Sequence, residues 1–90
     1  MTLNDVMFIE SYPKIDLHGF DRDSARVAIQ DFIRDEIKLK QPIIVIVHGC
    51  GSGILRKTCH EILRKNKKVL DFKTFYYNSG CTIVLLSIDE

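Results

Sequence analysis

The stretch PIIVIVHGCGSG, residues 42–53, determines how the rest of the chain can fold. Its first half is a run of β-branched residues after a proline, which predicts a fully buried strand over residues 42–47. The apolar spacing from Ile54 to Asn66 predicts a helix directly after the glycines. The first N–H groups of a helix lack partners and its dipole favours negative charge, so a strand, a glycine turn and a helix start form an anion site. We therefore expect phosphate at this turn, although the glycines could serve only to turn the chain.

Length and composition place the chain among ordinary globular proteins. It has 90 residues, enough for one domain, with 46% hydrophobic and 28% charged residues. No apolar run approaches the roughly 20 residues that span a bilayer, and residues 1–12 do not resemble a signal peptide. The three cysteines are odd in number and lack C-x-x-C spacing, which argues against a disulfide framework or a zinc site. These features favour a reduced, cytoplasmic setting without a membrane partner.

The charges are unevenly distributed along the chain, although the net charge is only +1. Residues 56–68 hold six basic side chains against one acidic side chain, whereas residues 1–24 hold five acids against two bases. The basic excess therefore lies on the helix whose N-terminus would face the anion. Such a helix can simply present a solvated face. Its position also suits nucleic acid, with contacts to phosphates from Arg56, Lys57 and Arg64.

The remaining elements follow from periodicity and breaker residues. Residues 14–17 predict a first strand, and Asp21 or Asp23 offers an N-cap for the helix that follows and ends before Pro42. The second helix is expected to bury Leu55, Cys59, Ile62 and Leu63 and to expose Arg56, His60 and Arg64. Further segments are a third strand over 69–77, a hairpin turn at Asn78-Ser79-Gly80, a last strand over 81–88, and a short strand or surface strip over 6–9.

The resulting order is β-α-β-α-β-β, which predicts an α/β two-layer sandwich. Right-handed crossovers place both helices on one face of a four-stranded sheet. The other face of two very apolar strands is too hydrophobic to leave in water. Residues 1–13 form an N-terminal extension to the domain at 14–90, and either they or a partner chain should cover that face. A weak homodimer through it is therefore one of the expected arrangements.

Two His-Gly pairs end two of the predicted strands, at His18 and at His48. The carboxyl ends of parallel strands lie at one edge of an α/β sheet, where ligands gather. Asp16, His18 and His48 should therefore converge beside the glycine turn. Histidine suits proton transfer near neutral pH, and a nearby carboxylate can orient it. A histidine of this kind taken alone is more often a structural group at a strand end, and the pairing of two beside the glycine turn is what favours a site.

Two spaced motifs resemble those of the Smr (small MutS-related) domain family. They are Asp16-Leu17-His18-Gly19 and His48-Gly49-x-Gly51-x-Gly53-x-Leu55-Arg56, and Gly80-x-Thr82 resembles the family's end. The resemblance covers residues 14–88. It implies a fold similar to the C-terminal domain of translation initiation factor three, a mixed sheet with the last strand antiparallel and central. It also implies nucleic-acid binding and, in many members, endonuclease activity on structured DNA or ribosome-associated mRNA.

The resemblance assigns the candidate site position by position. Asp16, His18 and His48 take the catalytic positions, with Asp16 orienting a histidine and the histidines sharing the roles of base and acid. The position of Cys50 is commonly basic in the family. The predicted phosphate and nucleic-acid contacts are Gly19, Gly49, Cys50, Gly51, Ser52, Gly53, Arg56, Lys57 and Arg64. No metal-ligand set is predicted, but cleavage of DNA would require water activated by a divalent metal at Asp16.

Two alternatives remain open. The domain could bind nucleic acid without cleaving it. Cys50 and Arg56 also form a C-x5-R pattern with Gly53 midway, which resembles the phosphate loop of cysteine-based phosphatases. The sequence shows no aromatic platform for stacking bases, so recognition of the backbone or of shape is expected, without distinction between DNA and RNA.

Overall fold

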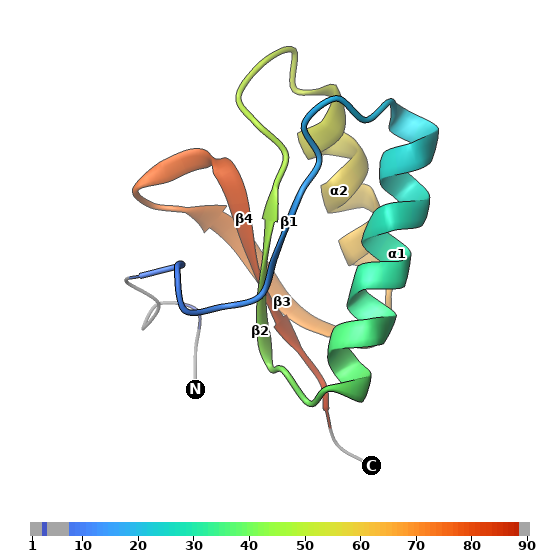
Figure 1. Cartoon of the computed structure of the whole chain (residues 1–90), viewed down its shortest axis with the longest axis vertical. Helices are drawn as coiled ribbons and strands as arrows, with labels where there is room; N and C mark the ends of the chain where they lie inside the picture. The colour runs from blue at the N-terminus through green and yellow to red at the C-terminus, as the bar shows by residue number, and fades with distance from the viewer. Residues whose placement is uncertain (1–2, 4–7, 89–90) are drawn as a thin grey trace.

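Two buried strands, β2 and β4, form the centre of a mixed four-stranded sheet in the computed structural model of the chain, which describes residue 3 and residues 8–88. The order along the sheet is β1-β2-β4-β3. Strand β1 is parallel to β2, and β4 is antiparallel to both β2 and β3 (Figure 1). The predicted sandwich with a central, antiparallel last strand is confirmed. The strands are β1 (Lys14–Asp16), β2 (Ile43–Val47), β3 (Val69–Phe75) and β4 (Asn78–Leu86).

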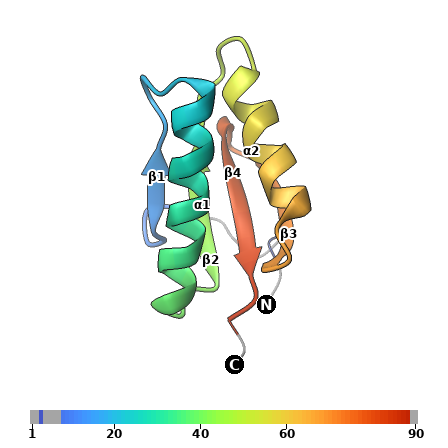
Figure 2. The same cartoon turned by 90° about the vertical axis from the view of Figure 1, so that its right-hand side faces the viewer.

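The two helices, α1 (Arg22–Lys38) and α2 (Ile54–Lys65), lie side by side on one face of the sheet (Figure 2). Of the two N-cap candidates, Asp21 caps α1, because its carboxylate accepts a hydrogen bond from the Ser24 N–H at 2.7 Å. Both helices bury apolar residues against alternate residues of β2 and β4, including Ile44, Ile46 and Val84. In the described part of the chain, no helix has the length and apolar character needed to cross a bilayer.

The described residues before β1, residue 3 and residues 8–13, contribute side chains that cover the opposite face of the sheet. Leu3 is buried there, and Ile9 and Tyr12 pack against a cluster that includes Val45 and Ile83. Both faces of the central strands are therefore buried, which explains their continuous apolar sequence. The strand suggested at residues 6–9 is not formed at 8–9, and residues 6–7 lie outside the described part of the chain.

The turn between β3 and β4 differs from the prediction. The turn consists of Tyr76 and Tyr77, because Phe75 pairs with Asn78 across the ladder and β4 already begins at Asn78. Gly80, expected in the turn, is a buried strand residue. A Cβ on Gly80 would lie 3.3 Å from the Gly49 Cα, so this glycine serves close backbone approach.

Candidate functional site

The glycine loop between β2 and α2, residues 48–53, is attached to the start of β4. The backbone N–H groups of His48 and Gly49 both donate to the Gly80 carbonyl, each at 2.9 Å. Gly49 and Gly53 have φ values of 82° and 86°, in the left-handed region that side chains disfavour. The loop is therefore held by two constraints, a shared carbonyl on β4 and two glycine-dependent turns.

The N-terminus of α2 is open to an anion. Gly53 supplies no side-chain cap, the first turn has no acidic residue, and the Ser52 hydroxyl meets the Ile54 N–H only at 3.4 Å. Arg56 and Lys57 are exposed in this first turn. Within the described part of the chain, no carboxylate forms an ion pair with either of them. Unpaired amides and unpaired cations therefore face the same solvent region.

The second strand end, at Asp16 and His18, lies at the same edge of the sheet. Asp16 is opposite Val47 in the parallel register, and the Leu17 N–H donates to the Val47 carbonyl at 2.9 Å. The Asp16 carboxylate accepts a hydrogen bond from the backbone N–H of His18 at 2.9 Å, which fixes the turn. His18 is exposed, and Gly19 follows with a φ of 81°. Asp16 therefore orients the backbone at His18, whereas the prediction gave it contact with a ring.

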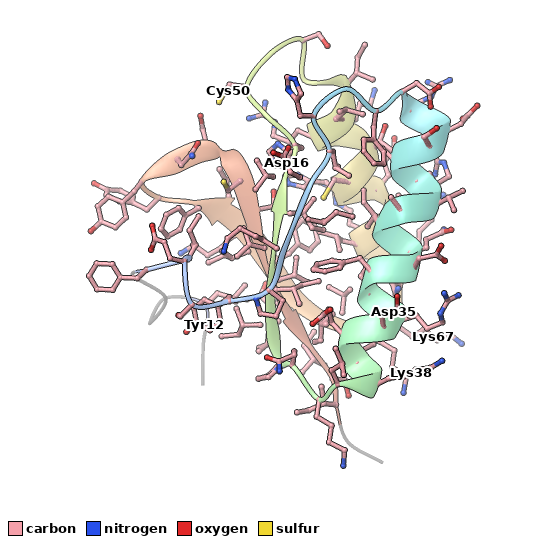
Figure 3. All side chains as sticks on the ribbon, viewed as in Figure 1. Tyr12, Asp16, Asp35, Lys38, Cys50 and Lys67 are labelled. Atoms are coloured by element: carbon pink, nitrogen blue, oxygen red, sulfur yellow. The ribbon has the colours of Figure 1, made fainter. Side chains whose placement is uncertain are left out.

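An open groove separates the turn after β1 from the glycine loop. Its volume is about 610 Å³, and it is lined by residues 20–23 on one side and by Ser52, Ile54 and Leu55 on the other. Figure 3 shows Asp16 and Cys50 toward the same end of the molecule, opposite the end that carries Lys38. Among the described residues, no group of three or more His, Cys, Asp or Glu side chains is placed to hold a metal ion.

His48 is inside the domain. It is 7% exposed; its ring Nδ1 lies 3.0 Å from the Gly49 carbonyl, and its Nε2 lies 2.7 Å from the Thr82 hydroxyl. A carbonyl only accepts, so Nδ1 carries the proton and the Nε2 of the neutral ring accepts from the Thr82 hydroxyl. The Nε2–H of His60 then donates to the same Thr82 oxygen, at 2.9 Å. These bonds form one chain from α2 through β4 to the glycine loop.

The two histidines of this hydrogen-bonded network, His48 and His60, both favour the neutral form. Burial is the main cause of the lowered pKa of His48, and the charge on Arg56 lowers it further while the Gly49 hydrogen bond opposes the shift. Burial also lowers the pKa of His60, with added repulsion from His48, Arg64 and Arg56. Since both ring nitrogens of His48 are engaged, its position fits a residue that holds the loop in place. Of the predicted acid–base pair, the exposed histidine is His18.

The sequence reasoning missed His60, which it placed in solvent. The ring is half-buried, packs at 5.1 Å from the Phe72 ring and meets the His48 ring edge-on at 6.0 Å. Arg64 lies over the other end of this cluster, 5.9 Å from the Phe72 ring centre. In the sequence, the position of His60 at the border of the apolar stripe of α2 is the feature that indicates partial burial. The sequence analysis names its partner Thr82 only within the Gly80-x-Thr82 motif of the Smr resemblance and assigns it no contact.

Cys50 is exposed at the outer side of the loop, and its Sγ lies 3.3 Å from the Ser79 hydroxyl on β4. This contact turns the thiol toward the hairpin, and among the described residues no hydrogen bond joins it to Arg56. The other two cysteines are buried. Burial raises the pKa of Cys59 to about 12 and also raises that of Cys81, so neither is a reactive thiolate.

The fold and the two motifs together define a small α/β domain whose glycine loop and exposed histidine share one edge of the sheet. The chain belongs to the Smr domain family, whose model matches residues 15–87. It is 32% identical over 85 residues to the endonuclease MutS2 of Aquifex aeolicus, and 34% identical over 74 residues to that of Streptococcus suis. These matches cover 91% and 79% of the chain, but only 11% and 10% of the relatives' own lengths.

Two solved structures share the fold. The Smr domain of Thermus thermophilus MutS2 superposes with a TM-score of 0.80 at 27% identity, over 82% of this chain and 96% of that one. YdaL, a stand-alone small MutS-related protein from Escherichia coli, also superposes with a TM-score of 0.80, at 21% identity. That match covers 86% of this chain and 68% of YdaL, and it supports the fold alone.

Proposed function

We propose that this Smr domain binds nucleic acid at the glycine loop and cleaves a phosphodiester there, with His18 as the proton-transfer residue. The observation that carries the proposal is the uncapped N-terminus of α2, with unpaired Arg56 and Lys57, at the same sheet edge as His18. The N–H groups and cations would hold a phosphate. The groove beside this helix start is lined on its other wall by residues 20–23, which follow closely after the exposed His18.

On RNA, the proposed reaction needs no external nucleophile. His18 accepts the proton of a 2′-hydroxyl, whose oxygen attacks phosphorus while the bond to the 5′-oxygen breaks. The leaving oxygen takes a proton from the imidazolium or from water, which leaves a cyclic phosphate and a 5′-hydroxyl. The amides of residues 49–53 would stabilise the charge on the phosphoryl oxygens. His48 and Thr82 would act by holding these amides in position.

On DNA, the internal nucleophile is absent and water must attack the phosphorus. Asp16, exposed at the end of β1, would be the carboxylate offered to a divalent metal in that case. The described residues around it include no group of three or more His, Cys, Asp or Glu side chains to complete such a site, so they do not fit metal-assisted cleavage of DNA. The curated relatives are named endonucleases, which supports cleavage, although the chain spans only about a tenth of their length. The free cysteines support a reducing compartment, and we assign the cytoplasm.

Cleavage of labelled RNA and of branched DNA, each with and without EDTA, tests the proposal. We expect RNA cleavage that survives EDTA and is lost in His18→Ala, with His18→Ala still binding RNA. Cys50→Ser serves as the matched control in the loop and should keep its activity. Cleavage that persists in His18→Ala would refute the assignment of His18. Loss of phosphate-releasing activity in Cys50→Ser alone would instead favour a cysteine-based phosphatase.

A binding module without catalysis is the second candidate, and one observation favours it. Two of the three residues that the motifs predict for acid–base catalysis already make hydrogen bonds within the domain. Both ring nitrogens of His48 are hydrogen-bonded, and the Asp16 carboxylate accepts from the backbone N–H of His18. Salt-sensitive binding of RNA and DNA with no cleavage of either, under all four conditions, would establish this alternative.

A further inference from the structure

We propose that the tip of the β3–β4 hairpin is a subsite on which unpaired bases of the bound strand stack. This inference rests on the proposed nucleic-acid binding and adds to it a preference for single-stranded segments. The subsite consists of Phe8, Phe75, Tyr76 and Tyr77, named here the hairpin aromatic cluster. The sequence alone indicates no such platform, because Phe8 lies beside Phe75 and Tyr77 only in the fold.

The rings of the cluster are unusually open to solvent. Tyr76 is 86% exposed, Phe8 72% and Tyr77 66%, whereas Phe75 is buried beneath them. Three large aromatic side chains exposed at one place mark a binding surface more often than a chance feature. Tyrosine suits such a surface because its ring is apolar and its hydroxyl remains hydrated.

The cluster has a defined geometry. The ring of Tyr77 meets Phe75 at 5.6 Å and Tyr76 at 4.9 Å between centroids, both in edge-to-face arrangements. Beside them is a groove of about 270 Å³ lined by Phe8, Ile9, Glu10, Phe75 and Tyr77. The edge-to-face packing holds the rings in place and leaves ring faces in solvent. Such faces accept any base, because every base has a π-face.

The position of the cluster makes nucleobases its most suitable occupant. Tyr77 is three residues from Gly80, about 10 Å along an extended strand. Gly80 binds the Gly49 N–H at 2.9 Å, and Ser79 lies 3.3 Å from the Cys50 sulfur. A strand whose phosphate lies at the glycine loop can therefore continue over the hairpin. The main apolar face of the sheet is already covered by Leu3, Ile9 and Tyr12, which leaves the cluster at its rim.

The test compares two fluorescein-labelled DNA stem-loops in EDTA. One carries a single-stranded thymidine tail, and the other carries the same tail with abasic sugars, so that phosphates are equal and bases differ. We expect the wild-type chain to bind the thymidine tail about tenfold more tightly, which corresponds to about 1.4 kcal/mol. Tyr76→Ala/Tyr77→Ala should lose this preference and keep its affinity for the abasic tail. Tyr76→Phe/Tyr77→Phe should retain it, and so should Leu70→Ala, an exposed residue elsewhere on β3.

Intrinsic fluorescence gives a second, independent readout. The chain has three tyrosines and no tryptophan, and two of the tyrosines belong to the cluster. Stacked thymidines should quench this emission, and the abasic tail should not. Equal, salt-sensitive binding of both tails would overturn the stacking subsite while leaving nucleic-acid binding intact. Failure to bind either probe at low salt would overturn both the stacking subsite and nucleic-acid binding. If the chain sediments as a dimer and Tyr76→Ala/Tyr77→Ala abolishes the dimer, the cluster binds a second copy of the chain instead.

Discussion

His48, which begins the glycine loop, and His60, in the middle of α2, hydrogen-bond the same hydroxyl group, that of Thr82. Their rings meet edge-on with centroids 6.0 Å apart. Thr82 is fully buried on β4, so this hydroxyl links the central strand to both the helix and the glycine loop. The chain of bonds continues to the Gly49 carbonyl and explains how a loop of small residues can keep one conformation.

Replacing Thr82 by valine should therefore destabilise the domain. Valine keeps the volume of threonine but leaves the buried imidazole of His48 and the half-buried imidazole of His60 without their shared partner, at a cost of about 1–3 kcal/mol. Urea unfolding at neutral pH measures this loss. Thr82→Ser is the matched control, because it keeps the hydroxyl and removes only one methyl group, about 0.8 kcal/mol. Equal stability of Thr82→Val and the wild type would show that the network contributes nothing.

The same network predicts that stability falls with acidity. The folded-state pKa of His48 and of His60 is lowered, so as the pH falls through about 6.5 the unfolded chain takes up protons first. The unfolded state then binds more protons, and the free energy of unfolding decreases until the pH reaches the lowered folded-state values. Urea unfolding at pH 7.5, 6.5 and 5.5 measures the slope. His60→Gln cannot be protonated and should flatten it; an unchanged slope would contradict the assignment.

Much of the fold follows from local patterns in the sequence. The β-branched run at 42–47 and the apolar helical spacings predict the elements, and the right-handed crossover rule places both helices on one face. The turn was misplaced because Asn78 and Gly80 are strong turn residues. In the structure Gly80 instead provides the close approach of Gly49, a contact between segments about thirty residues apart.

The site was harder to predict for the same reason. The spacing of Asp16, His18 and His48 indicates a shared sheet edge, and the strand register places them there. The continuous apolar run at 81–88 indicates a central strand, but nothing local shows that Thr82 on this strand lies within hydrogen-bond distance of His60 on α2. Without that contact, the sequence places His60 in solvent. The hairpin aromatic cluster likewise depends on Phe8, which reaches Tyr77 only because the N-terminal segment crosses the sheet.

The glycines of the loop should differ in their tolerance of alanine. Gly49 and Gly53 have left-handed φ values, so Gly49→Ala and Gly53→Ala should each cost about 1–2 kcal/mol. Gly51 has no such φ, and a Cβ added to it would meet nothing within 4 Å. Gly51→Ala is therefore the matched control and should change stability by less than about 0.5 kcal/mol. Thermal unfolding of the three variants checks this order, and equal effects would show that the loop conformation is not what the glycines provide.

Binding to nucleic acid should depend steeply on salt through the first turn of α2. Each phosphate contact contributes about 0.7–0.9 to the slope of log K against log salt, because bound cations are released. Arg56→Glu/Lys57→Glu removes two such contacts, so the slope should become shallower by about 1.4–1.8 for every sequence tested.

The control variant reverses the charge of two lysines at the other end of the domain. Lys38 ends α1 and Lys67 follows α2, and Figure 3 shows both away from Cys50 and the glycine loop. Lys38→Glu/Lys67→Glu therefore gives the same net charge without touching the proposed contacts. Fluorescence anisotropy across a salt series measures both slopes. If the two double variants lose equal affinity, binding responds only to overall charge, and the first turn of α2 is not the phosphate site.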